Sequence, residues 1–353
     1  MSYGRTRNYT DGAITLLSPY ISRGVISTAE ILESLVHRGF TFEDCQTLVR
    51  ELAWRDYFQR VWQVREVESD LRSRQSGVSA TGFPKALAQA ATGIEAVDAS
   101  VHELYDRGYM HNHCRMYTAA IACNLAGTEW LEPARWMYYH LLDGDWGSNA
   151  CSWQWVAGTF SSKKYYANQE NINQFTNTAQ KGTWLDVDYE FLPRLSCPDY
   201  MRESAPLDLH TNLPEFDWPE IDPTLPVCIY NYYNMDPNWR SDQPYNRILL
   251  LEPEIFQKYP VSDKCLDFLF GLAANIPGML FFTGSWKKLA ERLGDSNVYF
   301  KEHPLNRHYR GTEDARDWLD AEVDGFHPSF SSYWKKIEPG LREAFRINAL
   351  IRS

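Results

Sequence analysis

Apolar residues in the first two hundred positions recur at the spacing of α-helices. Between positions 44 and 74, large apolar side chains return every four to six residues, as Leu48, Leu52, Phe58 and Trp62. This spacing predicts one long helix. Alternation of apolar and polar residues, which marks a half-buried strand, is scarce here. The pattern therefore favours a mainly helical region over residues 1–205.

Three shorter helices are expected after a break in this pattern. The stretch SGVSATGFP at 76–84 interrupts it with glycines and a proline. A helix over 95–107 should end at Gly108, because glycine suits the left-handed stop position. Two more helices are expected over about 110–125 and 132–142, the second with Pro133 in its first turn.

The chain changes character after residue 205. Residues 206–226 hold five prolines and several acids, which predicts a linker or an extended strap. Residues 227–353 begin with short runs rich in β-branched and aromatic residues, with a helical stretch over 262–275 between two of them, and return to a helical pattern from about 313. The runs are PVCIYNYY, RILLLEP, GMLFFTG and NVYFKEH. We therefore predict a mainly α protein: a helical domain at 1–205, a proline-rich linker at 206–226, and a small α/β unit with parallel strands and C-terminal helices at 227–353.

Composition and charge narrow the class of protein. The net charge is −11, and such a balance does not favour non-specific binding of nucleic acid. No run of about 18 apolar residues predicts a membrane span, and the N-terminus lacks the apolar segment of a signal peptide. Seven cysteines without a CxxC pair suit a reducing compartment, so we expect a cytoplasmic protein. Aromatic residues reach 14%, which is typical of large cores, interfaces or flat-ring ligands.

Arg115 is expected to be buried, so its guanidinium requires a carboxylate partner. In YMHNHCRM at 109–116, helical spacing puts Asn112, Arg115 and Met116 on one face. A guanidinium inside an otherwise apolar helix must be paired, and Asp143 or Asp145 could supply the partner. A structural ion pair and a helix cap are the simpler interpretation. The neighbouring residues His111, His113 and Cys114 diverge around the helix axis, so no metal site is predicted.

Two other clusters allow both a structural and a functional interpretation. Glu51, Trp54 and Arg55 share one helix face and form either a surface ion pair or the wall of a pocket. Near the N-terminus, Tyr3, Thr15 and Ser18 lie close in sequence, and Ser18 precedes Pro19 at a predicted helix start. Ser18 is either an N-cap or one of several groups that hold a phosphate.

Four stretches, in this order and spacing, resemble the flavin-binding helical domain of the photolyase/cryptochrome family. They are YGRTRNYTDG…LLSPYISRG, ELAWRDYF, TGIEAVDASVHELYDRGYMHNHCRM and LLDGDWGSN…WQWVAG, and the resemblance extends over about residues 3–195. It implies an FAD cofactor. It places Tyr3, Thr15 and Ser18 at the diphosphate, and Arg115 paired with Asp143 beside the isoalloxazine ring. It places Asp145 near the ribose and Asn149 near the flavin N5.

The resemblance also implies a lesion pocket and an electron relay. Glu51, Trp54, Asn112, Met116 and Trp155 match positions that line the pocket of cyclobutane pyrimidine dimer photolyases, and Arg55 sits beside them as a further cofactor-binding candidate. Photolyases flip the damaged base out of the duplex, so apolar walls must replace the lost stacking. Trp153 and Trp130 match the first two members of the chain that supplies electrons to the photoexcited flavin.

The sequence departs from the family pattern at several places. The position of the third relay tryptophan is Leu87, so the outer step would use Trp146, Trp136 or Tyr139, or would be absent. A family arginine that contacts DNA phosphate is His113, and a Thr-Ser pair reads Ile14-Thr15. Because the resemblance begins near Met1, we expect the N-terminal antenna domain to be missing, with the α/β unit placed after the flavin domain instead. The cysteines match no iron–sulfur pattern.

These residues are compatible with three functions. The first is a light-driven DNA repair enzyme, a lyase that transfers an electron from excited reduced FAD to a flipped-out dimer in UV-damaged DNA, single- or double-stranded. The second is a cryptochrome-like blue-light photosensor or flavin redox protein that acts through a protein partner. The third is a helical interaction module whose aromatic residues are only core. No membrane partner is expected.

Overall fold

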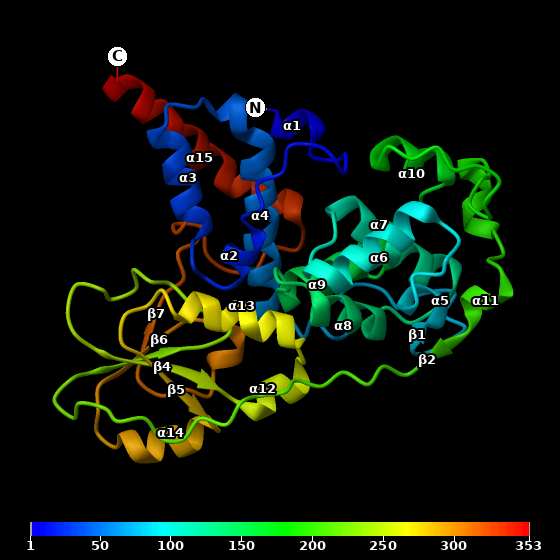
Figure 1. The fold of residues 1–353 in the computed structure, drawn as a ribbon. Coiled ribbons are helices and arrows are strands. Elements are labelled where there is room, and N and C mark those ends of the chain that lie inside the picture. The colour runs from blue at the N-terminus through cyan, green and yellow to red at the C-terminus, as the bar shows by residue number, and fades with distance from the viewer. Residues whose placement is uncertain (1, 353) are drawn as a thin grey trace. The chain divides into compact units, whose positions relative to one another are not determined.

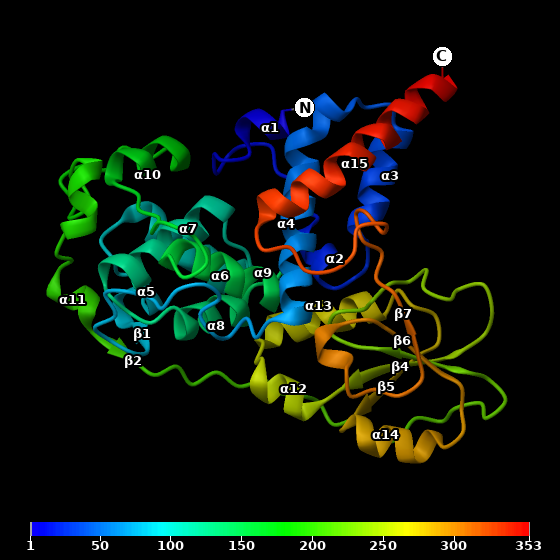
Figure 2. The same cartoon turned by 180° about the vertical axis from the view of Figure 1, so that it is seen from behind.

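The chain forms two compact units, each assembled from two separate stretches of sequence. The computed structural model describes the backbone of residues 2–352 and the side chains of residues 2–347. The first unit comprises Met1–Leu16 and Val64–Leu209, and the second comprises Leu17–Gln63 and His210–Ser353. Residues 17–63, expected in an N-terminal helical domain, thus pack with the C-terminal part of the chain. Figures 1 and 2 show the elements from opposite sides.

The first unit is mostly helical. Its longer helices pack in pairs, α6 on α7, α7 on α9 and α8 on α9. In chain order the elements are α1 (Tyr3–Thr6), β1 (Phe83–Pro84), α5 (Lys85–Ala88), α6 (Glu95–Arg107), α7 (Asn112–Ala120), the π-helical turn η1 (Ile121–Leu125), α8 (Leu131–His140), α9 (Trp146–Ala157), α10 (Gln169–Thr176), the 3₁₀ turn η2 (Tyr189–Arg194), α11 (Asp199–Arg202) and β2 (Ser204–Ala205).

Local sequence signals fix the ends of these helices. Gly108 ends α6 at φ +66°, in the left-handed region, which confirms the predicted stop. Asp145 begins α9 by accepting the backbone N–H of Ser148 at 2.7 Å, and Gly158 ends it at φ +79°. The predicted helix over 110–125 is α7 continued by η1. These caps place the two chemically rich segments, 112–116 and 143–155, on neighbouring packed helices.

The second unit combines helices with a parallel sheet. Its helices are α2 (Ser18–Ser22), α3 (Thr28–His37), α4 (Phe42–Val64), α12 (Pro253–Lys258), α13 (Asp263–Ala273), α14 (Trp286–Leu293), the short 3₁₀ turn η3 (Pro304–Asn306) and α15 (Phe330–Arg352). The strands are β3 (Val227–Tyr230), β4 (Asn246–Leu251), β5 (Met279–Thr283), β6 (Val298–Lys301) and β7 (Thr312–Asp314). All strand pairings in this sheet are parallel, in the order β5-β4-β3-β6-β7.

This sheet confirms the predicted α/β unit and shows why its strands read as apolar runs. Helices α13 and α14 lie on opposite faces (Figure 1), so β3 and β4 are buried on both sides. Val227, Ile229 and Leu250 face α14, where Trp286 and Leu289 complete the core. The chain reverses direction across the sheet between β3 and β6, which makes this edge the topological switch point of a doubly wound fold.

Two predicted helical spans are shorter than expected. The helix predicted over 44–74 ends at Val64, because the backbone after it is held by a side chain instead: buried Gln154 accepts from Leu71 N–H and donates to the Val67 carbonyl. The predicted C-terminal helix begins at Phe330 and not near 313, because residues 312–314 form β7 beside β6. In both places, tertiary hydrogen bonds outweigh local preference.

The proline-rich segment is an extended strap over much of its length. Residues 206–222 have no regular secondary structure. Within the second unit, Thr283 N–H donates to the Phe216 carbonyl at 3.1 Å, and Thr211 exchanges hydrogen bonds with Val261. These bonds fasten the strap beside β5. Among the described residues, no helix has both the length and the apolar character needed to cross a membrane.

Candidate functional site

Arg115 on α7 pairs with Asp143. Its Nη2 donates to both carboxylate oxygens, at 2.9 and 3.0 Å, and its Nε donates to the Met110 carbonyl at 2.8 Å. The side chains of Arg115 and Asp143 are 24% and 9% exposed, so the charges are largely removed from water. Helical spacing alone left Asp143 and Asp145 as possible partners of Arg115, and in the structure the partner is Asp143. Such a pair is a fixed, planar set of donors and acceptors.

Asp145 and Asn149 hold the start of α9. Asp145 is 5% exposed and serves as the N-cap described above. Asn149 is half-buried, and its Nδ2 donates to the Ala134 carbonyl of α8 at 2.8 Å. Within the described residues the Asn149 side-chain oxygen has no protein partner, so this oxygen is the part of the side chain left to a ligand.

Helices α7 and α9 leave several predicted side chains accessible. Asn112 is exposed and Met116 is half-buried, one helical turn apart on α7. On α9, Trp155 is 38% exposed while Trp153, two residues earlier, is 1% exposed. The helix therefore presents one indole to the core and one to the surface, which is the division of labour expected for a relay residue and a stacking residue.

Trp130, predicted as the second relay residue, is also buried and lies beside a carboxylate that the sequence did not indicate. Trp130 is 1% exposed, and its indole N–H donates to Asp70 Oδ1 at 2.8 Å. Asp70 lies in an irregular loop with no recognisable motif, so no signal in the sequence indicated it. The third-tryptophan position, Leu87, is fully buried.

The predicted candidates for an outer relay step have different surroundings. Trp136 is buried, stacks on Phe83 at 4.4 Å between ring centroids, and donates its N–H to the Tyr105 hydroxyl at 3.0 Å. Trp146 is also buried, with Tyr138 packed edge-on at 5.4 Å. Tyr139 is half-buried beside His140.

The predicted phosphate-binding residues lie in different units. Tyr3 is in α1 and Thr15 is in the exposed irregular segment after it, both in the first unit. Ser18 opens α2 in the second unit. The N-cap interpretation of Ser18 is wrong, because the cap residue is Leu17 and Pro19 occupies the first turn.

In the second unit, α4 carries Glu51, Trp54 and Arg55 on one half-buried face. Arg55 Nη2 donates to Ser22 Oγ of α2 at 2.7 Å. Trp54 is stacked on Phe330 of α15, with centroids 3.7 Å apart and planes 9° apart. The indole expected to wall a lesion pocket is therefore covered on one face by a ring of its own chain.

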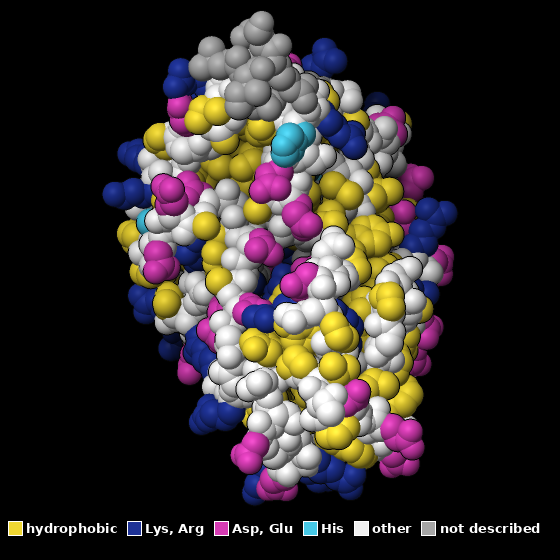
Figure 3. All heavy atoms as spheres, turned by 90° about the vertical axis from the view of Figure 1, so that its left-hand side faces the viewer, with side chains coloured by type: hydrophobic (Ala, Val, Ile, Leu, Met, Phe, Trp, Pro, Cys, Tyr) yellow, Lys and Arg dark blue, Asp and Glu magenta, His cyan; other side chains and the backbone are white. Residues whose placement is uncertain are grey.

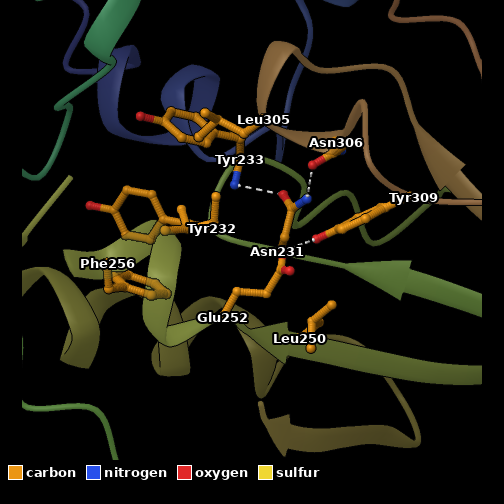
Figure 4. Close-up of a pocket in the computed structure, with 10 residues that line it drawn as sticks. Asn231, Tyr232, Tyr233, Leu250, Glu252, Phe256, Leu305, Asn306 and Tyr309 are labelled. Carbon is orange, nitrogen blue, oxygen red and sulfur yellow. Dashed lines mark hydrogen bonds between the residues drawn. The ribbon is translucent and has the colours of Figure 1, made fainter. Parts of the chain in front are cut away.

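A small pocket lies at the carboxyl edge of the sheet, at the switch point (Figure 4). Buried Glu252 follows β4 and accepts hydrogen bonds from the Tyr309 hydroxyl at 2.7 Å, from His308 at 2.8 Å and from Trp286 N–H at 3.1 Å. The hydrogen bond to Glu252 raises the pKa of His308. Because these partners already occupy the carboxylate, and the Asn231 amide is bonded to Asn306 and to Tyr233 N–H, the pocket offers a ligand mainly aromatic walls.

His113 does not replace the positive charge of the family arginine. Burial lowers the pKa of its imidazole to about 4, so the ring is neutral at pH 7. Among the described residues, no group of three or more His, Cys, Asp and Glu side chains is placed to hold a metal ion.

The residues of the first unit fit a flavin. A flavin ring presents carbonyl oxygens and ring nitrogens of both donor and acceptor character, and the Arg115–Asp143 pair and the Asn149 amide match both kinds. The buried Trp153 indole N–H has no hydrogen-bond partner among the described residues, so nothing polar competes for this ring.

Comparison with known proteins identifies the same segment. Residues 48–201 match the family model described as the FAD binding domain of DNA photolyase. A deoxyribodipyrimidine photo-lyase of Streptomyces griseus is 34% identical over 166 residues, which cover 44% of this chain and 36% of the relative. A cryptochrome DASH of Natronomonas pharaonis is 29% identical over 202 residues, 52% of this chain and 41% of the relative. The chain thus spans well under half the length of these two relatives.

Solved structures of the same family are also similar to part of the chain. A Synechocystis cryptochrome is 24% identical with a TM-score of 0.42, covering 49% of this chain and 39% of that one. A class III photolyase from Agrobacterium tumefaciens is 25% identical with a TM-score of 0.40, covering 49% and 41%. The matched domain defines the cofactor as FAD, and residues 48–201 of this flavoprotein are similar to the FAD-binding domain of the photolyase/cryptochrome family.

Proposed function

We propose that this flavoprotein uses blue light to repair cyclobutane pyrimidine dimers in UV-damaged DNA. One observation carries the proposal: on two helices that pack together, the FAD-binding domain keeps Trp155 and Asn112 exposed and Trp153 buried. An exposed indole on a helix is costly unless it meets a ligand, since the apolar ring stays in water. A base extruded from DNA supplies a stacking partner in addition to Tyr165, whose ring centroid lies 6.0 Å from that of Trp155.

Each accessible residue has a distinct task in this proposal. Trp155 stacks on the extruded pyrimidines and replaces the stacking lost in the duplex. Asn112 donates and accepts hydrogen bonds at a pyrimidine edge. Met116 supplies a polarisable apolar contact on the same face of α7. Glu51 and Trp54, on α4 of the second unit, carry the residue types that the resemblance assigned to dimer recognition.

The cofactor-binding residues hold the ring rather than react. The Arg115–Asp143 pair is preorganised by its three hydrogen bonds, so it can orient a flavin without paying further entropy. Asn149 offers its free amide oxygen, and Asp145 keeps this helix start in place. When bound, reduced and excited by light, FAD would supply the electron that splits the dimer. Trp153 and Trp130 deliver electrons that reduce the cofactor beforehand.

A specific contact favours a photosensor as the second candidate. The stack of Phe330 on Trp54 covers one of the residues expected to meet a lesion. The net charge of −11 and the neutral His113 weaken attraction to DNA phosphate. On the face drawn in Figure 3, acidic and basic side chains are interspersed and form no uniform basic area. A sensor would keep the flavin and its photoreduction and would signal to a protein partner.

The test uses the full flavin-loaded chain, photoreduced, with an oligonucleotide that carries one dimer. Repair predicts dimer splitting under blue light and none in the dark, measured by chromatography of the oligonucleotide. Trp155→Ala should lower affinity for the dimer by about ten- to a hundredfold, because one stacked base contributes about 1–3 kcal/mol. Phe191→Ala removes another exposed ring, 53% exposed, and should leave affinity unchanged.

Failure has a clear signature. Photoreduction without dimer splitting, and a DNA affinity that does not change with salt, would support the photosensor instead. In that case Phe330→Ala, which uncovers Trp54, should not create dimer affinity. If the purified chain holds no flavin, both candidates are wrong.

A further inference from the structure

The indole N–H of Trp130 reaches an exposed carboxylate although its ring is buried. Trp130 precedes α8 and donates to Asp70 Oδ1 at 2.8 Å, and Asp70 is exposed to solvent. Gln75 holds both residues in place. Its backbone N–H donates to Asp70 Oδ2 at 3.0 Å, and its side-chain Oε1 accepts the backbone N–H of Trp130 at 2.9 Å. Gln75 is itself 8% exposed and anchored to the Thr128 carbonyl.

The other relay tryptophan has the opposite environment. Trp153 is equally buried, yet its indole N–H has no hydrogen-bond partner among the described residues. A carboxylate at hydrogen-bond distance stabilises a positive charge on the ring it contacts, while an apolar surrounding does not. A positive hole is therefore favoured on Trp130 over Trp153. This preference moves the hole from Trp153 on α9 to Trp130 at the start of α8, and these two helices pack together.

No third tryptophan continues this path at the expected place, because that position is the buried Leu87. The nearest alternative by sequence, Trp136, donates its N–H to a neutral phenol, Tyr105. A phenol stabilises a cation less than a carboxylate does, and it is a poor base. Among these indoles, Trp130 is the one with both a charged acceptor and a route for a proton to water.

We propose that the electron relay ends at Trp130 and that Asp70 is its proton outlet. The inference rests on the proposed light-driven electron transfer. Trp153, having given one electron to the photoexcited flavin, takes one electron from Trp130. The Trp130 radical cation then breaks its N–H bond: the proton passes to Asp70 Oδ1, and the electron pair stays on the ring, which becomes a neutral radical. Asp70 releases the proton to solvent, and a soluble thiol reductant later returns one electron while water returns the proton.

Two measurements on the full chain test this assignment. In the flavin-free protein labelled with ¹⁵N at its indoles, Asp70→Asn should shift the Trp130 N–H signal, while Glu66→Gln, which removes a charge from the same exposed loop, should leave it in place. In the flavin-loaded protein, flash photolysis should show a Trp130 radical cation that decays about tenfold more slowly in Asp70→Asn than in wild type. The decay should slow in D₂O for wild type and not for Asp70→Asn.

The outcomes separate this inference from the proposed function. Equal radical decay in wild type and Asp70→Asn, with no D₂O effect, overturns the proton outlet while light-driven electron transfer stands. Loss of the long-lived radical in Trp136→Phe but not in Asp70→Asn would move the end of the relay to Trp136. If neither wild type nor Asp70→Asn forms any tryptophan radical, both this inference and the relay are wrong. A merely structural role for Asp70 would change stability but not the isotope effect.

Discussion

At the scale of single residues, the Arg115–Asp143 pair is the most constrained feature of the candidate site. Asp143→Asn keeps the shape of the side chain but leaves the guanidinium of Arg115 without its counter-charge at a position where it is 24% exposed. We expect a loss of about 2–3 kcal/mol in the free energy of unfolding, below the full cost for a completely buried pair. Flavin content after purification should fall as well. Urea unfolding and the flavin absorbance of the purified protein measure the two effects.

A surface pair provides the control. Arg107 and Glu103 approach to 3.9 Å on α6, with side chains 77% and 37% exposed. Arg107→Ala should change stability by less than about 0.5 kcal/mol and leave flavin content unchanged, because exposed pairs are screened by water. Equal effects of the two substitutions would mean that Arg115 and Asp143 form only a structural surface contact.

Single residues also show which parts of the candidate site can be predicted from the sequence. The need of Arg115 for a carboxylate follows from helical periodicity, since the charge falls within an apolar segment. Spacing alone does not select Asp143 over Asp145, because both lie in the same turn; the family resemblance selected Asp143, and the folded chain shows that Asp145 instead caps α9. Asp70 could not be found at all, since its role depends on a loop geometry set by Gln75.

At the scale of elements, buried Asp56 joins three segments of the second unit. It lies on α4 and accepts from Thr28 Oγ1 of α3 at 3.0 Å and from Leu319 N–H at 2.7 Å. Burial raises the pKa of this carboxyl from 3.8 to about 6, although the Leu319 and Thr28 hydrogen bonds and the nearby Arg60 and Arg316 oppose the shift. The folded state therefore holds a proton that the unfolded state has already lost between about pH 4 and 6.

This raised pKa sets the sign of a pH effect. Where the folded state binds more protons, stability falls as pH rises. Relative to Asp56→Asn, the wild type should lose up to about 3 kcal/mol between pH 4 and 6, the equivalent of about two pH units. Urea unfolding of both proteins across this range gives the difference. Asp44→Asn is the control: hydrogen bonds from Thr41 lower the pKa of Asp44, so the wild type should instead lose stability relative to this variant as pH falls.

Elements with strong periodic or capping signals were predictable, and those set by tertiary hydrogen bonds were not. The helix over 95–107 and its Gly108 stop follow from local sequence. So do β3 and β4, because burial on both faces demands continuous apolar runs. The true end of α4 depends on Gln154, which lies far along the chain. Strand β7 is three mostly exposed, polar residues, so no apolar pattern marks it.

At the scale of the whole molecule, the second unit is built from segments far apart in sequence. Residues 17–63 pack with the α/β sheet through contacts that no local pattern reveals. Arg23 lies 3.6 Å over the Tyr232 ring, and its carbonyl accepts Met235 N–H at 2.8 Å. Trp62 packs edge-on against His303 at 4.9 Å. Sequence composition changes at 205, and for this reason it suggested a boundary there instead.

A glycine at this junction tests the packing in the full chain. Gly24 has φ +65°, and a Cβ there would lie 2.6 Å from the Tyr233 carbonyl oxygen, a backbone atom that cannot rotate away. Gly278 has a similar φ of +71° but open space around its missing Cβ. Gly278→Ala should therefore cost only the left-handed strain, about 1 kcal/mol. Gly24→Ala should lower the free energy of unfolding by clearly more, about 3 kcal/mol. The backbone around Gly24 must then also move away from the loop that follows β3.

The difference between the two substitutions isolates the junction, since both carry the same backbone strain. Urea unfolding supplies the free energies, and hydrogen exchange locates the effect: protection should fall in α2 and in residues 231–236 for Gly24→Ala, and α9 in the first unit should keep its protection. Equal losses in the two variants would show that residues 17–63 do not pack closely on the loop after β3, and that the unit follows the compositional boundary near 205 instead.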